Sequence, residues 1–269
     1  MLILKSLMYS STITALFAAS LTAYSFLAIN EPINKIIILF NFLGTFIAYN
    51  LIALITLYDK DIQSDSMNWL KSHKNKIVLS LCLLTPLLIY YSLSLKFILL
   101  INFIHLLLIT LIYEKGLLLK FNLFFNFREK TYLKPLIISY CWTMACVLTP
   151  MLENSIVNWS LLLSSLLSVF SLCLMYDLRD IYTDKTEGLI TIAHKLKRSH
   201  FKLLICFIYT VSIIFRNFII PISEHSSLYL CEILFLSFLI YKAKPDQDDY
   251  FYILISDGLI AFKLLYVLG

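Results

Sequence analysis

Three aspartates have the spacing of a metal-binding helix face. Asp177, Asp180 and Asp184 follow one another at intervals of three and four residues, so on a helix they share one face. Carboxylate oxygens are the ligands that Mg²⁺ prefers, and Mg²⁺ usually binds one or two carboxylates together with water and a substrate phosphate. The spacing therefore indicates a magnesium site that serves a phosphate-bearing ligand.

Basic residues follow these aspartates closely in the chain. Lys185 comes directly after Asp184, and Lys195, Lys197 and Arg198 lie a short distance further on. Lysine and arginine bind phosphate through charge-assisted hydrogen bonds, so this segment is suited to neutralise the same ligand. The alternative interpretation is a solvated loop in which acidic and basic residues simply mix.

The composition predicts a membrane protein with an all-α fold. Of the 269 residues, 60% are hydrophobic and 14% are charged, whereas a soluble domain carries about 25% charged residues. We expect one transmembrane helical domain over residues 1–269, with the lipid bilayer as its surroundings. The net charge of +5 is assigned to loops at one membrane face rather than to nucleic-acid binding.

Nine apolar segments are long enough to be predicted as transmembrane helices, since a helix needs about 20 apolar residues to cross a bilayer. The segments preceding and following them carry most of the charge. The predicted ranges are 7–29, 36–58, 77–95, 97–114, 134–152, 156–176, 201–221, 226–242 and 249–268.

The lysines and arginines predict the orientation. If the N-terminus is cytoplasmic, only Lys35, Lys96 and Arg216 fall outside, and Lys263 falls within the last predicted helix. All other basic residues lie on the inner side, as the positive-inside rule requires. We therefore expect a multi-pass protein of the plasma or inner membrane, with its N-terminus and its aspartate-rich loop in the cytoplasm.

Two polar residues within the predicted helices need an environment that compensates for their polarity. Asn50 is expected to face the bundle interior, because an amide in contact with lipid is costly. Glu232 lies near the outer end of the eighth predicted helix, and we expect its side chain to extend toward the membrane surface.

The segment YDLRDIYTDKTEGLITI resembles the second aspartate-rich motif of the UbiA-type prenyltransferase superfamily. The family pattern is YDxxDxxxD, followed by a glycine and a threonine. The resemblance implies a bundle of nine transmembrane helices with aspartate motifs on the cytoplasmic loops after helices two and six. The matching residues are Tyr176, Asp177, Asp180, Asp184, Gly188 and Thr191.

The first aspartate motif of that family, NDxxDxxxD, is incomplete in this sequence. Asn50 matches its asparagine, but leucines and a tyrosine stand where the three aspartates belong. Asp61 and Asp65 keep the DxxxD spacing about three turns further on, and they are predicted as additional metal ligands. The resemblance also implies contacts with the substrate diphosphate, for which we name Asn50, Arg128, Lys130 and Lys185.

The function implied by the resemblance is Mg²⁺-dependent transfer of an isoprenyl group from a prenyl diphosphate to a membrane-soluble acceptor, either an aromatic quinone precursor or a lipid. Asp177, Asp180 and Asp184 are the expected catalytic and metal-binding residues. The alternative is a catalytically silent relative that binds a prenyl lipid or a membrane partner. A transporter is disfavoured because charges within the predicted helices are few.

Overall fold

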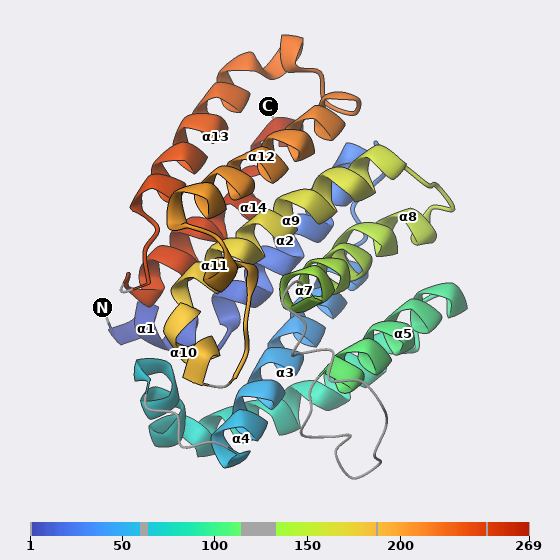
Figure 1. The fold of residues 1–269 in the computed structure, drawn as a ribbon. Coiled ribbons are helices and arrows are strands. Elements are labelled where there is room, and N and C mark those ends of the chain that lie inside the picture. The colour runs from blue at the N-terminus through green and yellow to red at the C-terminus, as the bar shows by residue number, and fades with distance from the viewer. Residues whose placement is uncertain (1, 60–63, 114–132, 187, 246, 269) are drawn as a thin grey trace.

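The computed structural model describes residues 2–59, 64–113, 133–186, 188–245 and 247–268, and these residues form helices without any strand (Figure 1). The elements in chain order are α1 (Leu2–Tyr9), α2 (Thr12–Ala28), α3 (Lys35–Asp59), α4 (Asp65–Ser92), α5 (Phe97–Tyr113), α7 (Leu133–Thr143), η3 (Met144–Leu148), α8 (Thr149–Glu153), α9 (Trp159–Arg179), α10 (Ile181–Thr186), α11 (Ile192–Lys195), α12 (Arg198–Asn217), α13 (Ile222–Lys242), η4 (Phe251–Ser256), α14 (Gly258–Phe262) and α15 (Leu265–Leu268).

Each of the nine predicted ranges falls on one of these helices or on consecutive helical elements. Six are long and apolar enough to cross a membrane, or up to seven if the pair α1 and α2 counts as one bent span. That pair bends by 68°, because Ser11 between the two helices adopts a left-handed conformation. The expected all-α, multi-pass membrane fold is confirmed, although α5 is short and α13 is not among the helices that qualify by this criterion.

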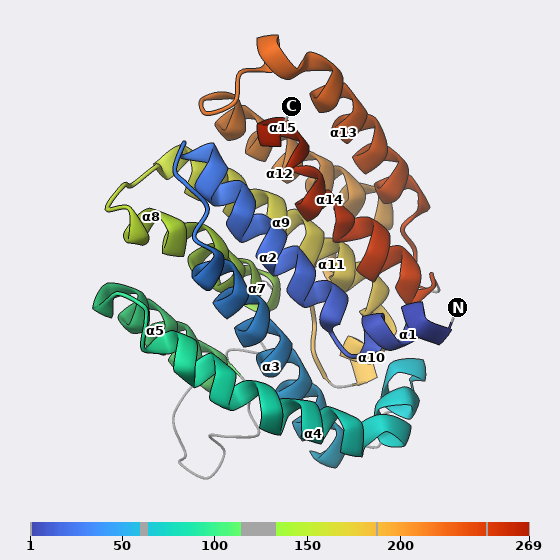
Figure 2. The same cartoon turned by 180° about the vertical axis from the view of Figure 1, so that it is seen from behind.

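Helix α9 lies at the centre of the bundle and packs against α7 and α12 (Figure 1). Its buried serines, such as Ser165 and Ser168, are small enough to let neighbouring helices approach closely. Seen from behind, α2 crosses the same central region, while α4 and α5 lie at the periphery (Figure 2). The aspartates at the end of α9 are thus held by the most enclosed helix.

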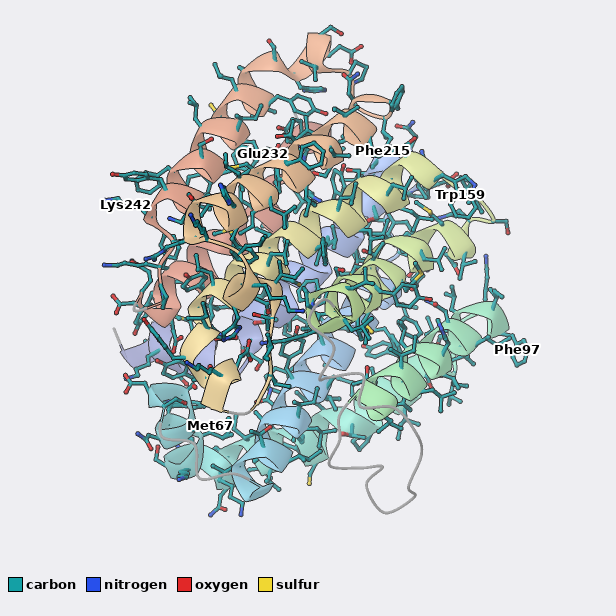
Figure 3. All side chains as sticks on the ribbon, in the orientation of Figure 1. Met67, Phe97, Trp159, Phe215, Glu232 and Lys242 are labelled. Carbon is teal, nitrogen blue, oxygen red and sulfur yellow. The ribbon has the colours of Figure 1, made fainter. Side chains whose placement is uncertain are left out.

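The outer surface of the bundle is apolar. Phe97 and Trp159 project from the ends of α5 and α9 and are largely exposed (Figure 3). Leu83 of α4 and Phe207 of α12 are also exposed. Such a surface would be unfavourable in water and is suited to contact with lipid.

Two asparagines satisfy the carbonyl groups that a π-helical turn leaves open. Element η3 is π-helical, and such turns shift the backbone hydrogen bonds. The amide of Asn41 in α3 donates to Ala145 O at 2.8 Å and to Thr22 Oγ1 at 2.9 Å. The amide of Asn102 in α5 donates to Met144 O at 3.0 Å. These hydrogen bonds join α3 and α5 to η3.

Replacing Asn41 with leucine is expected to lower the free energy of unfolding by about 1–2 kcal/mol, because interhelical hydrogen bonds in membranes average about 0.6 kcal/mol each and two would be lost. Thermal unfolding in detergent can measure the change. Asn68→Leu is the matched control, since the Asn68 side chain is exposed in the first turn of α4. An equal loss in both variants would contradict the assignment.

The expected position of Glu232 is wrong. Its side chain is fully buried between α12 and α13 (Figure 3). Glu232 forms an ion pair with the buried Arg216 and accepts hydrogen bonds from Tyr209 and Tyr266. A buried carboxylate is stable only with such partners, so the ion pair, rather than the membrane surface, compensates its charge.

Candidate functional site

A cavity of about 490 Å³ lies at the end of the bundle where α9 terminates. Its wall is built from α1, α2, α3, α4, α7, α9, α14 and the region around η4. The helix ends that meet there are those that the charge pattern places on one side of the membrane. The cavity therefore joins elements that are far apart in the sequence.

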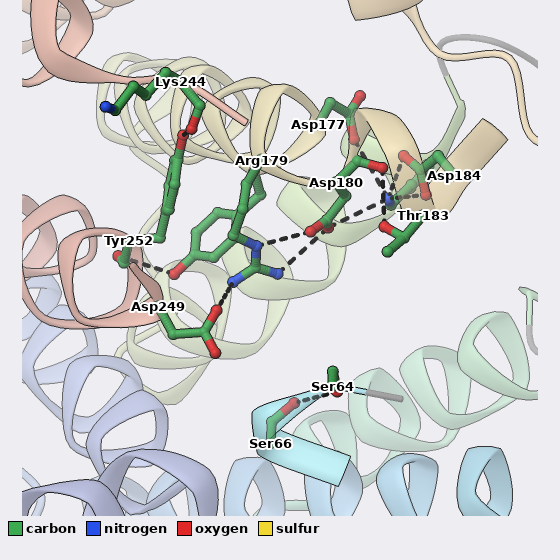
Figure 4. A network of polar contacts seen from close by, with 12 residues as sticks. Ser64, Ser66, Asp177, Arg179, Asp180, Thr183, Asp184, Lys244, Asp249 and Tyr252 are labelled. Carbon is green, nitrogen blue, oxygen red and sulfur yellow. Dashed lines mark hydrogen bonds and ion pairs between the residues drawn. The ribbon is translucent and has the colours of Figure 1, made fainter. Parts of the chain in front are cut away.

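The three aspartates of the motif surround one lysine (Figure 4). Lys134 Nζ lies 2.8 and 2.9 Å from the two carboxylate oxygens of Asp184. The same nitrogen lies 3.6 Å from Asp177 Oδ1 and 3.7 Å from Asp180 Oδ2. The predicted convergence of the three carboxylates is thus present in the structure, with an ammonium group between them.

The local chain geometry brings this cluster together. Asp177 is in the last turn of α9, Asp180 is its C-terminal cap, and Asp184 lies one turn further in α10. The amide of Asp184 donates to Asp180 O at 2.7 Å, which continues the helical path between the two elements. Lys134 comes from the first turn of α7, where a proline is tolerated next to it. Packing of α7 on α9 then places the lysine against the aspartates.

The carboxylates differ in burial and in partners. Asp177 and Asp184 are buried, whereas Asp180 is partly exposed. Among the described residues, Asp177 Oδ2 is buried without any hydrogen-bond partner. An unpaired carboxylate oxygen inside a protein is costly, and Asp177 lines the cavity. This oxygen is therefore a candidate ligand for a cation in the cavity.

A second cation, Arg179, connects the end of α9 to the C-terminal helices (Figure 4). Its Nε donates to Asp180 Oδ1 at 2.7 Å, and its Nη1 lies 3.6 Å from Asp249 Oδ1. The guanidinium group also lies over the rings of Tyr176 and Tyr252, with distances of 4.8 and 5.7 Å to the ring centroids. The cavity thus has two fixed cations at its charged end.

Away from this charged end the cavity wall is mostly apolar and aromatic. It includes Ile138, Val169 and Leu172. Trp142 of α7 and Tyr49 of α3 also line it, and the indole Nε1 donates to the tyrosine hydroxyl at 3.0 Å. A ligand with a charged head and a hydrocarbon tail matches this division.

The other sequence-predicted site residues are not part of this cluster. Asn50 is buried as expected, but its amide donates to Ser10 O and Phe46 O, and it does not line the cavity. Asp65 at the start of α4 is exposed and lies 3.7 Å from Lys5. Lys185 is exposed and outside the cavity wall. The remaining three predicted residues, Asp61, Arg128 and Lys130, lie outside the described residues.

The fit to a magnesium ion can be judged from the donor atoms. In the part of the chain that the structure describes, no three Asp, Glu, His or Cys side chains are arranged to hold a metal ion, because Lys134 lies between the three aspartates. Asp177 and Asp180 nevertheless both face the cavity. One or two carboxylates suffice for Mg²⁺ when phosphate and water complete its coordination, so these two residues fit the ion.

Lys134 was missed as a site residue by sequence reasoning. In the sequence it is only one of the many basic residues assigned to the inner side, at the start of the predicted range 134–152. Three carboxylates at the end of a membrane helix need a cation nearby. This requirement alone indicates that a lysine or arginine belongs to the site. Which lysine provides the cation depends on helix packing, so the sequence offered several equivalent candidates.

Comparison with known proteins concerns the fold. No family model matches the sequence, and no curated protein matches it significantly. Among solved structures, a digeranylgeranylglyceryl phosphate synthase in membranes aligns over 98% of this chain and 98% of its own, with a TM-score of 0.57 and 16% sequence identity. This chain has the fold of that synthase. The resemblance to UbiA-type prenyltransferases is thereby confirmed at the level of the fold.

An all-α membrane bundle of this type accounts for almost the full length of both chains. The chain is therefore an integral, multi-pass membrane protein. The charged end of its cavity is formed by the aspartates that resemble the second family motif.

Proposed function

We propose that the chain is a Mg²⁺-dependent membrane prenyltransferase that transfers an isoprenyl group from a prenyl diphosphate to a membrane-soluble acceptor. The single observation that supports this most strongly is the charged cluster of Asp177, Asp180 and Lys134 at one end of a cavity whose remaining wall is mostly apolar. The similar fold of a digeranylgeranylglyceryl phosphate synthase also supports this proposal.

The charged end of the cavity would bind the diphosphate. When bound, Mg²⁺ would neutralise the diphosphate and stabilise it as a leaving group. Asp177 and Asp180 would hold this ion, because both line the cavity and Asp177 Oδ2 has no other partner among the described residues. Lys134 and Arg179 would stabilise the negative charge that grows as the diphosphate departs.

The apolar part of the cavity would hold the isoprenyl chain and exclude water. Departure of the diphosphate leaves an allylic cation, which water would otherwise capture. Tyr49 and Trp142 line the cavity, and an aromatic ring that turns its face to a cation stabilises it by roughly 0.5–2 kcal/mol. The acceptor would then attack the cation and lose a proton.

We further propose that the whole chain is one membrane domain whose cavity end faces the cytoplasm of a plasma or inner membrane. The support is the distribution of lysines and arginines, which lie predominantly in the segments on that side. Labelling of single cysteines in α10 from either side of sealed vesicles would test the orientation. Access from the external side alone would contradict it.

The proposed activity can be tested with purified protein in lipid nanodiscs. The assay contains Mg²⁺, a radiolabelled prenyl diphosphate of 10, 15 or 20 carbons, and a panel of polyprenyl-accepting phenols and glyceryl phosphate lipids. We expect a labelled lipid product with matching release of diphosphate, and Asp180→Asn should abolish both. No product with any acceptor, while a known prenyltransferase is active in parallel, would contradict the proposal.

A catalytically silent binding protein is the second candidate function. The observation that favours it is the cavity wall of α3, where Tyr49, Ile52, Ala53 and Thr56 provide no carboxylate. It predicts Mg²⁺-dependent binding of a prenyl diphosphate without release of diphosphate. Turnover in the nanodisc assay would exclude this candidate.

Enlarging a side chain in the apolar wall is expected to shorten the donor that the protein accepts. Ala53→Trp would place an indole in the cavity from α3. Loss of contact with one methylene in an apolar pocket costs about 1–3 kcal/mol, so kcat/KM should fall at least tenfold more for a 20-carbon than for a 10-carbon donor. Ala53→Ser is the control. Equal losses with both donors would contradict the assignment of this wall to the isoprenyl chain.

A further inference from the structure

Asp184 occupies a different position from the other two aspartates of its motif. Both of its carboxylate oxygens accept hydrogen bonds from Lys134, at 2.8 and 2.9 Å. Its side chain is buried, and it does not contribute to the cavity wall. Asp177 and Asp180 do contribute to that wall, and they lie further from the ammonium group.

The backbone around Asp184 holds its carboxylate in place. Its amide donates to Asp180 O at 2.7 Å, and its carbonyl accepts from the amide of Leu189 at 2.8 Å. Leu189 is buried, and Gly188, with a positive φ of 74°, allows the chain to turn back toward the cluster. Asp184 is therefore fixed by a closed turn on the side of Lys134 that faces away from the cavity.

Lys134 is available to the cavity on its other side. It lines the cavity, although its side chain is mostly buried. An ammonium group has three donor hydrogens, and two are directed to the oxygens of Asp184. The third can reach an anionic oxygen in the cavity. A second observation also indicates a charged ligand there, since Asp177 Oδ2 is buried in the wall without a partner among the described residues.

We propose that Asp184 is a positioning residue for Lys134, and that Lys134 contacts the diphosphate of the substrate. The metal ion is then shared by Asp177 and Asp180, and Asp184 does not bind it. This inference rests on the proposed function for the identity of the ligand. The three aspartates of the motif therefore have different roles. Asp177 and Asp180 are metal ligands, and Asp184 positions Lys134.

The first test uses inorganic diphosphate without metal. Calorimetry is performed on the full-length protein in nanodiscs with EDTA. We expect Lys134→Met to weaken diphosphate binding by at least tenfold, a change equivalent to about 1.4 kcal/mol. Asp184→Asn should cause a similar loss, and the double variant should lose no more than either single variant. Asp177→Asn should not weaken this binding.

The second test measures metal binding by electron paramagnetic resonance of Mn²⁺. The double variant Lys134→Met/Asp184→Asn removes the pair together and leaves the net charge of the cluster unchanged. We expect its Mn²⁺ affinity to remain within about threefold of the wild type, whereas Asp177→Asn should lose at least tenfold. Asp184→Glu, which preserves the ion pair, serves as the second variant if Asp184→Asn does not fold, and it should retain diphosphate binding.

The outcomes separate this inference from the proposed function. A tenfold loss of Mn²⁺ affinity in the double variant, unchanged diphosphate binding in Asp184→Asn, or no diphosphate binding by the wild type would each overturn the inference. If the predicted binding pattern is found but no acceptor is prenylated, the proposed function fails and the assignment of Lys134 and Asp184 stands.

Discussion

Replacing Glu232 with alanine is expected to lower the free energy of unfolding by about 3–5 kcal/mol, because removal of one partner leaves the other charge of a buried ion pair uncompensated. Arg216 is buried, and its guanidinium also lies over the rings of Tyr229 and Tyr266, with distances of 4.9 and 4.6 Å to the ring centroids. Arg216 Nε has no hydrogen-bond partner among the described residues. Loss of Glu232 would leave the buried guanidinium without its carboxylate partner.

The reason for so large an effect is that one carboxylate supports several helices. Glu232 in α13 accepts from Tyr209 in α12 and from Tyr266 in α15. Each hydroxyl that loses its acceptor inside the bundle adds about 1–3 kcal/mol of desolvation cost. Unfolding of the purified protein in mixed micelles, followed by circular dichroism, can measure the loss.

Two variants control this prediction. Asp65→Ala removes an exposed ion pair with Lys5 and should change stability by less than about 1 kcal/mol. The double variant Arg216→Met/Glu232→Leu replaces both charges with apolar groups and should recover most of the loss. If Glu232→Ala is as stable as Asp65→Ala, the buried network does not hold these helices together.

Replacing Asp177 with asparagine is expected to reduce prenyl transfer by about 10²–10³-fold, the range observed when a single electrostatic contact to a transition state is removed. Asp177 lines the cavity and has an oxygen without a partner among the described residues. The amide keeps the shape of the side chain but loses the negative charge that a divalent cation requires.

Asp177→Asn is expected to maintain or raise the stability of the folded protein, although it lowers the activity. Asp177 lies 3.6 Å from Lys134, which keeps its closer contacts to Asp184. Loss of an incompletely paired buried carboxylate removes a desolvation cost. The melting temperature of Asp177→Asn should therefore equal or exceed that of the wild type, as measured by differential scanning fluorimetry.

A matched comparison separates function from folding. Asp65→Asn should keep full activity, since Asp65 is exposed and outside the cavity wall. If Asp177→Asn were destabilised by more than a few degrees, its loss of activity would reflect unfolding. Full activity in Asp177→Asn would contradict its assignment as a metal ligand.

The helices could be predicted from sequence because the signal is local. Each predicted range needs only its own run of apolar residues, and the ranges 36–58 and 156–176 fall on α3 and α9. The shared face of Asp177, Asp180 and Asp184 also depends on helical spacing within one segment. Such local patterns predict the same helix and the same shared face regardless of how the helices pack together.

The partners of these residues could not be predicted in the same way. The sequence alone places Arg216 on the external side and Glu232 near the membrane surface, because each residue is considered on its own helix. Their ion pair forms only when α12 and α13 pack together. The same applies to Lys134, which is 50 residues from Asp184 in the chain. Charge pairing between helices needs the tertiary structure.

Arg179 links the charged end of the cavity to the chain just before η4. Asp180 is held by Arg179, and Arg179 also contacts Asp249 just before η4. A divalent cation that binds Asp180 must compete with the guanidinium for the same carboxylate. Weakening that contact at the end of α9 also frees Arg179 to shift relative to Asp249. A cation at the charged end of the cavity would therefore alter the contact between α9 and Asp249, beside the C-terminal helices that share the cavity wall through Ile253 and Ile260.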